Sequence, residues 1–314
     1  MLNAILILVI LAVLGLAITQ IIQGKRLAML RRRARRSMLV GPEAHIRLQK
    51  QVYERLAAAD CRSRGANPAL PIEFRSEWGE DVLLYELFDG RPDGVFVEVG
   101  ALDGRRLSVS WIFEAIGWKG LLVEPIPEKY EECRRQRPGS CVVRGALGPG
   151  GSAGTIDFVV PLEDDLQGSS HRDVESAAVE SINGLRDADA KTRRIRVPLM
   201  SMDDALEQAK LVRVDFASID VEGAELDVLR GFDLARFQVR VLVIEDLTLG
   251  QDIRVPDHLA ELGYVHTMWI GGNRVFVRRD DAEMMARAQR LAETVYSPLV
   301  RPRGHNDTWQ HDLR

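Results

Sequence analysis

The sequence contains little cysteine, since Cys61, Cys133 and Cys141 are the only three in 314 residues. Three is an odd number, and none of the spacings between them is that of a metal-binding pair. The sequence therefore gives no support to a disulfide framework or to a cysteine-based zinc site. We expect reduced thiols that pack as small apolar side chains in a cytosolic compartment.

Strong net charge is also absent, because 42 basic and 46 acidic residues leave a formal charge of −4. A molecule with this balance is not a nucleic-acid binder on electrostatic grounds, and we predict no nucleic-acid partner. The charge is nevertheless uneven along the chain. Residues 25–36 hold seven lysines and arginines and no acidic residue, so the remainder is distinctly acidic.

The run Leu2–Ile22 contains no charged residue at all. About 20 apolar residues span a hydrocarbon core of roughly 30 Å as a helix. The run lacks the basic start and the Ala-x-Ala cleavage site of a secretory signal. The basic residues that follow it place the rest of the chain in the cytoplasm by the positive-inside rule. We predict a single-pass anchor in the (inner) cell membrane, with a peripheral hydrophobic helix as the alternative.

A Gly-x-Gly-x-x-Gly turn, which cradles the pyrophosphate of a dinucleotide, is missing as well. Instead, the short apolar run Val95–Val99 leads into a turn bounded by Gly100 and Gly104, where backbone N–H groups can approach a ligand closely. The next apolar run ends in Glu124, at the distance where an acid accepts hydrogen bonds from ribose hydroxyls. Glu98 would repel a pyrophosphate. A ligand with a cationic or neutral group beside its ribose fits better, and S-adenosylmethionine is the obvious one.

Apolar and amphipathic stretches alternate along the chain, which indicates a parallel sheet covered by helices. A helix is predicted at 43–59, Ser76 is placed to cap another, and Gly271-Gly272-Asn273 joins 264–269 to 274–278 as an antiparallel hairpin. A parallel sheet that ends in such a hairpin is the outline of the S-adenosylmethionine-dependent methyltransferase fold. We expect further strands at 95–99, 120–124, 141–146, 195–199, 215–220 and 240–244, and further helices at 107–116, 127–136, 201–209, about 223–229 and 256–262.

Carboxylates follow several of the expected strands, and the carboxyl ends of parallel strands share one rim. We predict that Asp220, Glu222 and Glu245 are catalytic, because acids brought together raise one another's pKa and poise one as a general base. The alternative interpretation of Asp220 and Glu222 is that they are acids at a helix N-terminus that complement the helix dipole. This interpretation accounts for Glu222 but explains poorly why Asp220 stands at the end of an apolar strand. Magnesium is a less favoured occupant of the cluster, and we predict no metal ligands.

Three segments resemble the FkbM-type methyltransferase family: Phe96–Gly104, Gly117–Pro125 and Ile219–Glu225. The resemblance runs from about residue 76 to 277, and the Asp-x-Glu-Gly-x-Glu block is its most specific part. It implies a Rossmann-like class I methyltransferase sheet. It also implies an S-adenosylmethionine-dependent O-methyltransferase whose acceptor is a sugar or a related hydroxyl-bearing metabolite.

By the same resemblance, Glu98 and Gly100 line the methionine side of the cofactor and Glu124 takes the ribose. The family often has Asp at the position of Glu98, and Asn at the position of Val109, directly after Ser108. The longer Glu98 side chain should still reach, but the contact of that Asn would be missing. We predict the cofactor-binding residues Glu98, Gly100, Asp103, Gly104, Ser108, Glu124 and Pro125.

We divide the chain into four parts: an anchor (1–23), a basic juxtamembrane segment and helical stalk (24–71), an FkbM-like domain (72–280), and a C-terminal helix and tail (281–314). A polar stretch at 163–192 is too long for an ordinary connection and is typical of a lid, a substrate loop or partial disorder.

The leading hypothesis is an enzyme that methylates a hydroxyl of a sugar, glycan or related metabolite at the cytoplasmic face of the lipid bilayer. One alternative is a non-catalytic interaction module in a membrane glycan-assembly complex. Another is a nicotinamide-dependent oxidoreductase. The sequence makes no prediction of the oligomeric state.

Overall fold

The computed structural model describes residues 42–161 and 192–293. The predicted anchor, the polar stretch up to residue 191 and the end of the C-terminal tail lie outside these residues. Within the two described ranges, no helix has the length and apolar character needed to cross a membrane.

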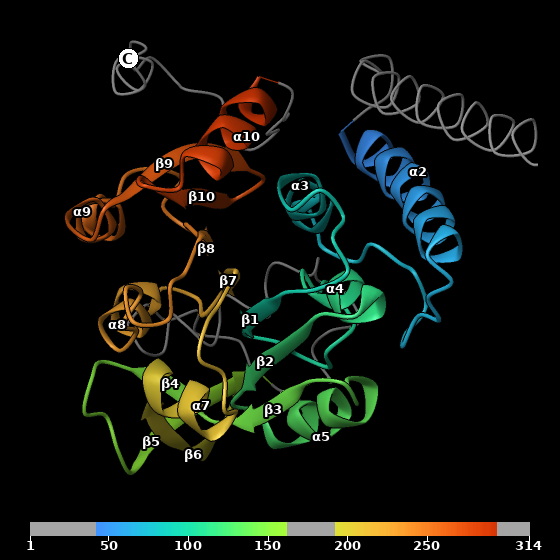
Figure 1. The fold of residues 1–314 in the computed structure, drawn as a ribbon. Coiled ribbons are helices and arrows are strands. Elements are labelled where there is room, and N and C mark those ends of the chain that lie inside the picture. Colours follow the sequence, from blue (N-terminus) through green and yellow to red (C-terminus); the bar gives the residue numbers. More distant parts are fainter. Residues whose placement is uncertain (1–41, 162–191, 294–314) are drawn as a thin grey trace, which may run out of the picture.

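The main sheet has seven strands in the order β3-β2-β1-β7-β8-β10-β9 (Figure 1). Its strands pair in parallel except at β10, which runs antiparallel to both β8 and β9. This arrangement confirms the predicted parallel sheet with a closing antiparallel hairpin. The strands are β1 (Val95–Val99), β2 (Lys119–Glu124), β3 (Cys141–Arg144), β7 (Phe216–Ile219), β8 (Val241–Glu245), β9 (Tyr264–Ile270) and β10 (Asn273–Arg278).

Helices cover both faces of this sheet, so its central strands are buried on both sides. Phe96 and Val97 are consecutive in β1 and point to opposite faces, yet both are fully buried. Phe96 packs in the layer formed with α2 (Pro42–Ser63), α3 (Glu80–Leu87), α4 (Trp111–Ile116), α5 (Pro127–Gln136) and α10 (Ala282–Ala292). Val97 packs with α7 (Met202–Gln208), α8 (Glu225–Arg230) and α9 (Arg254–Glu261).

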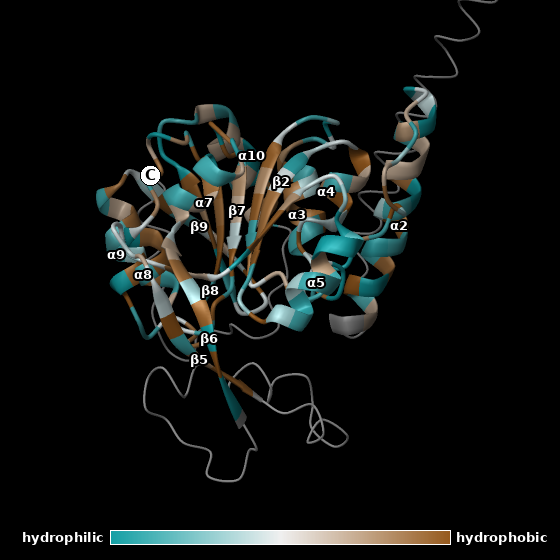
Figure 2. Ribbon diagram, turned by 90° about the horizontal axis from the view of Figure 1, so that it is seen from below, coloured by the Kyte–Doolittle hydropathy of each residue, from teal (hydrophilic) through white to brown (hydrophobic). Residues whose placement is uncertain are grey.

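A second sheet of three strands, in the order β4-β6-β5, was not predicted. The single strand expected at 141–146 is in fact two strands separated by Gly145. The first, β3, belongs to the main sheet, and the second, β4, belongs to the three-stranded sheet. Figure 2 shows the long pair of β5 and β6 projecting away from the main sheet. The strands of the second sheet are β4 (Ala146–Gly148), β5 (Thr155–Pro161) and β6 (Thr192–Ser201).

Two predicted helix starts differ from the structure, and one is confirmed. The helix expected at 107–116 begins only at Trp111, because Leu107 adopts a left-handed conformation with φ 58°. The N-cap of α3 is Gly79, with φ 91°, rather than Ser76, but the Ser76 hydroxyl still accepts the N–H of Asp81 in the first turn of this helix at 3.3 Å. The helix expected at 201–209 is present as α7, and it begins with a capping box in which Ser201 is the N-cap and Asp204 its partner.

Candidate active site

One cavity of about 980 Å³ lies along the rim where the parallel strands end. Val99, at the end of β1, pairs with Val123 of β2 on one side and with Ile219 of β7 on the other. The exits of these strands therefore lie side by side. Seven of the ten predicted site residues line the cavity: Glu98, Gly100, Glu124, Pro125, Asp220, Glu222 and Glu245.

Glu124 is a buried carboxylate at the end of β2, and only 2% of its surface is exposed. Its Oε1 accepts the backbone N–H of Ile126 and its Oε2 accepts that of Leu102, both at 2.8 Å. Burial raises the pKa of Glu124 to about 7 and outweighs the two backbone hydrogen bonds, which lower it. Each carboxylate oxygen can accept one more hydrogen bond, as a ribose with two neighbouring hydroxyls requires.

The turn after β1 needs its two glycines. A Cβ at Gly100, where φ is 82°, would lie 2.0 Å from the carbonyl oxygen of Asp220. A Cβ at Gly104, where φ is 80°, would lie 2.8 Å from side-chain atoms of Arg137 and Cys133. The exit of β1 therefore packs directly on the exit of β7, with no side chain between the two.

Asp103 and Gly104 belong to this turn but do not line the cavity. Asp103 Oδ1 accepts the backbone N–H groups of Arg105 and Arg106, at 2.8 Å and 2.7 Å. The side chain thus stabilises the turn as a local cap. The cofactor contacts predicted for these two residues remain predictions.

Glu98 is surrounded by partners from the loop that follows the turn. Its Oε1 accepts the Val109 N–H at 2.8 Å, and its Oε2 accepts the hydroxyls of Ser108, at 2.8 Å, and of Ser110. Ser108 lies outside the cavity lining, and its hydroxyl donates its hydrogen bond to Glu98. The structure therefore gives Glu98 and Ser108 a role in holding this loop, and their cofactor contacts are untested predictions.

Arg137, which sequence reasoning missed, sits behind Glu98 with no exposed surface. Its Nε donates to Glu114 at 2.8 Å, and its Nη1 donates to the Gly104 carbonyl oxygen at 3.0 Å and lies 3.6 Å from Glu98. A buried charge needs such partners. The guanidinium thus ties the glycine turn to α4 and to the end of α5, and no local sequence pattern marks it.

The three predicted catalytic acids come together at the exits of β7 and β8. Three carboxylate oxygens, one each from Asp220, Glu222 and Glu245, lie within 4.8 Å of one another. Burial, and then the neighbouring carboxylates of Asp220 and Glu222, raise the pKa of Glu245 far above its ordinary value. Such a group of acids shares protons, so it can take up the proton of a hydroxyl that approaches it.

The loop between β7 and α8 is shaped to present these acids. Glu222 and Gly223 both have positive φ, at 57° and 100°. Glu225 Oε1 accepts the Gly223 N–H at 2.9 Å, which closes the turn. Because α8 begins at Glu225, Glu222 lies outside the helix and its position is set by this turn. The oxygens of the acid cluster are also of the kind that a divalent cation binds.

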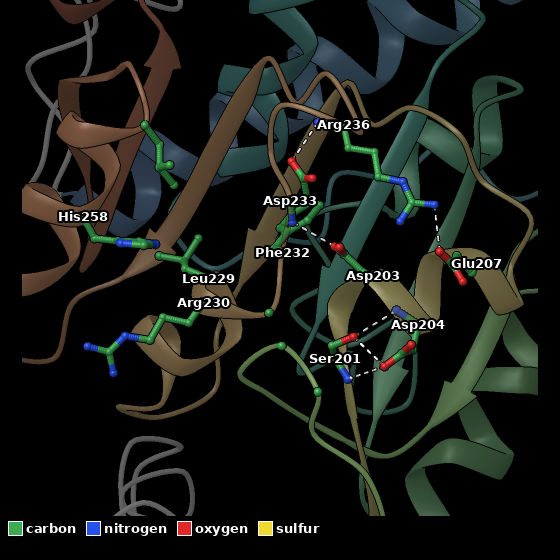
Figure 3. Close-up of a pocket in the computed structure, with 14 residues that line it drawn as sticks. Ser201, Asp203, Asp204, Glu207, Leu229, Arg230, Phe232, Asp233, Arg236 and His258 are labelled. Atoms are coloured by element: carbon green, nitrogen blue, oxygen red, sulfur yellow. Dashed lines mark hydrogen bonds and ion pairs between the residues drawn. The ribbon is translucent and has the colours of Figure 1, made fainter.

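A second cavity, of about 520 Å³, lies on the α7 and α8 side of the sheet and contains no predicted site residue (Figure 3). Its polar groups are largely paired with one another. Asp203 accepts the Asp233 N–H at 2.8 Å, and Arg236 donates to Glu207 at 2.7 Å. These pairs stabilise the surface between α7 and the 231–236 turn, and we assign the cavity no role in the reaction.

Comparison with solved structures returned methyltransferases of low sequence identity. The METTL16 methyltransferase domain is 10% identical, covers 73% of this chain and 80% of its own, and has a TM-score of 0.39. A methyltransferase from Geobacter sulfurreducens is 13% identical, with coverages of 71% and 86% and a TM-score of 0.33. Fibrillarin from Aeropyrum pernix in complex with S-adenosyl-L-methionine is 14% identical, with coverages of 64% and 76% and a TM-score of 0.32.

A comparison with the curated proteins gave no significant match. The model of the methyltransferase FkbM domain, in contrast, matches residues 98–265, which is more than half of the chain. The matched region includes the glycine turn, Glu124 and the acid cluster at the exits of β7 and β8. The chain therefore belongs to the FkbM methyltransferase domain family, which is a family of S-adenosylmethionine-dependent methyltransferases.

Proposed function

We propose that the protein is an O-methyltransferase that transfers a methyl group from S-adenosylmethionine to a hydroxyl of a sugar, glycan or related metabolite. The observation that carries this proposal is the shared cavity. Glu124 lies on one side of the Gly100 turn, the acids Asp220, Glu222 and Glu245 lie on the other, and all of them line it.

The residues present fit the cofactor. S-adenosylmethionine supplies a methyl group that is electrophilic because it is bound to a positively charged sulfur. Glu124 offers acceptor positions to the ribose hydroxyls, and the absent Cβ of Gly100 lets the exits of β1 and β7 lie against each other beside the cavity. These two features fix the cofactor's orientation along the rim, and orientation is the main requirement of a methyl transfer.

The acid cluster serves the acceptor. Asp220 is the exposed member, whereas Glu222 and Glu245 are partly buried. Glu245 holds a proton at neutral pH because of its raised pKa, so the negative charge of the cluster lies on Asp220 and Glu222. We assign Asp220 the task of accepting the hydroxyl proton as the oxygen is methylated, with Glu222 and Glu245 tuning its basicity.

The proposal also includes a place of action. The uncharged run Leu2–Ile22 and the basic residues at 25–36 support a single-pass anchor with the catalytic domain in the cytoplasm. An acceptor at the cytoplasmic surface of the membrane, such as a lipid-linked glycan, suits an enzyme held there. The family resemblance supports a sugar as the acceptor.

Two measurements on the full chain test these assignments. Calorimetry should show that S-adenosylmethionine binds the wild-type protein and binds Glu124→Ala much more weakly. Membranes incubated with methyl-labelled cofactor should yield a labelled glycan with the wild type and far less of it with Asp220→Asn. Wild-type protein that binds no S-adenosylmethionine would overturn the proposal. A labelled product that is not an O-methyl compound would overturn the acceptor assignment.

A further inference from the structure

The cavity continues past the acid cluster to a small group of residues that sequence reasoning did not single out. Asn273, the first residue of β10, is the register partner of Glu245 in β8. Directly opposed residues of an antiparallel pair place their side chains on the same face. Trp78, Glu80 and Asn273 line this end of the cavity, and we call them the Trp78 shelf.

One buried carboxylate positions the other two members of the Trp78 shelf. Glu80 is 2% exposed. Its Oε1 accepts a hydrogen bond from Asn273 Nδ2 at 2.7 Å, and its Oε2 accepts the backbone N–H of Trp78 at 2.9 Å. Because each oxygen of Glu80 binds one of its two neighbours, the main chain at Trp78 and the carboxamide of Asn273 are held next to each other.

The Trp78 ring lies against the turn between β9 and β10. A Cβ at Gly271 would come within 2.0 Å of Cγ of this indole, so the ring occupies the space that a side chain there would fill. Trp78 is only partly buried, and it lines the cavity as well as packing on the core. An indole in this position provides a rigid apolar surface beside a group of acids.

Hydrogen-bonding capacity is left over at the Trp78 shelf. The indoles of Trp111 and Trp118 donate to the carbonyl oxygens of Pro71 and Arg91. Trp78 Nε1, by contrast, donates to no other group in the described part of the chain, and Asn273 Oδ1 likewise accepts nothing there. One donor and one acceptor therefore remain for a ligand in the cavity.

The order of the strands places the Trp78 shelf on the acceptor side. From β2 with Glu124, the rim runs through β1 and β7 to β8 with Glu245 and then to β10 with Asn273. These four strand spacings amount to about 19 Å. A cofactor whose ribose is at Glu124 and whose methyl group faces Asp220 leaves the far end to the other substrate.

We propose that Trp78 and Asn273 form the acceptor subsite and that it takes a neutral sugar ring. The C–H face of the ring lies on the indole, and the ring hydroxyls meet Trp78 Nε1 and Asn273 Oδ1. A pyranose has the required combination of an apolar face and a polar edge. The inference rests on the proposed function, because it needs the cofactor at the opposite end of the cavity.

The test is saturation-transfer NMR on the full chain in lipid nanodiscs, with and without S-adenosylhomocysteine. The probes are methyl glycosides of glucose, galactose, mannose, rhamnose and fucose, with cyclohexanol as a non-sugar alcohol. Three variants are compared with the wild type. Trp78→Leu removes the aromatic surface, Trp78→Phe keeps a ring without the N–H group, and Trp269→Leu is a matched control, since Trp269 lies on β9 outside the cavity lining.

We expect at least one glycoside to receive saturation at its ring C–H protons in the wild type and in Trp269→Leu. Trp78→Leu should bind it about tenfold more weakly, with Trp78→Phe in between. Unchanged glycoside binding in Trp78→Leu, no glycoside bound by the wild type, or equal binding of cyclohexanol would each overturn the inference. S-adenosylhomocysteine affinity checks that the variants are folded. A wild type that binds glycosides but not S-adenosylhomocysteine would contradict the proposed function and leave the sugar subsite standing.

Discussion

Three carboxylate sites along one rim show how surroundings give the same chemical group different roles. Glu124 is buried among backbone N–H donors, and burial alone raises its pKa. Glu245 is buried beside two other acids, which raise its pKa further. Glu98 accepts hydrogen bonds from two serines and a backbone N–H, with Arg137 behind it. The different roles that we propose for these carboxylates, a ligand acceptor at Glu124, a proton-sharing cluster at Glu245 and an anchor for the loop at Glu98, follow from their environments rather than from the residue type.

The largest expected effect is on the turnover rate, and it distinguishes the role of the acid cluster from that of Glu124. Asp220→Asn removes the proposed proton acceptor, so the turnover rate should fall by about 10²–10⁴-fold. Affinity for S-adenosylmethionine should persist, because Glu124 is untouched. The checks are methyl incorporation into membranes and calorimetry, with Asp257→Asn, an exposed acid on α9, as the control. Equal loss of cofactor binding and turnover would show that the two ends of the cavity do not have separate roles.

Removing the charge behind Glu98 should mainly affect folding. Arg137→Met leaves Glu98 and Glu114 buried without their cation, so the free energy of unfolding should fall by about 3–5 kcal/mol. Arg134→Met, in the last turn of α5 just before Arg137 but with 62% of its side chain exposed, should change it by less than about 1 kcal/mol. Thermal or denaturant unfolding of both variants measures the difference. Equal stabilities would refute the anchoring role of Arg137.

Glu124 should show its role in the pH dependence of cofactor affinity. Ribose hydroxyls donate to the ionised carboxylate, so binding favours the form without the proton. Affinity for S-adenosylmethionine should therefore rise as the pH increases through about 7, the pKa of Glu124, and level off above it. Glu124→Gln should bind about 10–100-fold more weakly at high pH and lose this dependence. A wild-type affinity that falls over the same range would contradict the assignment.

The smallest expected effect concerns metal. If the acid cluster works by sharing protons, chelation with EDTA should leave the turnover rate unchanged. An activity that EDTA abolishes and Mg²⁺ restores would show that Asp220, Glu222 and Glu245 act as oxygen ligands instead.

Much of the site was predictable because its determinants are local. The strand, glycine turn and second strand that end in Glu124 lie within 30 residues, and both strands are largely apolar, with Glu98 the only charged residue inside β1. The acids at the ends of β7 and β8 were predictable because each directly terminates an apolar run. The carboxyl ends of parallel strands share one rim, so these acids were expected to meet there.

The remaining features depend on contacts that no short pattern encodes. Arg137 reaches Glu98 across 39 positions, and its role exists only because α5 ends beside the glycine turn. Trp78 and Asn273 are linked through Glu80 across nearly 200 residues. The β4-β6-β5 sheet was missed because β5 pairs with a strand on the far side of a long polar stretch, and its alternation was weaker than the runs of the main sheet.

The most direct test is a crystal structure of the protein with S-adenosylhomocysteine. The account predicts that both ribose hydroxyls lie within hydrogen-bonding distance of the Glu124 carboxylate and that the sulfur faces Asp220, Glu222 and Glu245. Nucleoside density elsewhere, or a sulfur directed away from these acids, would contradict it.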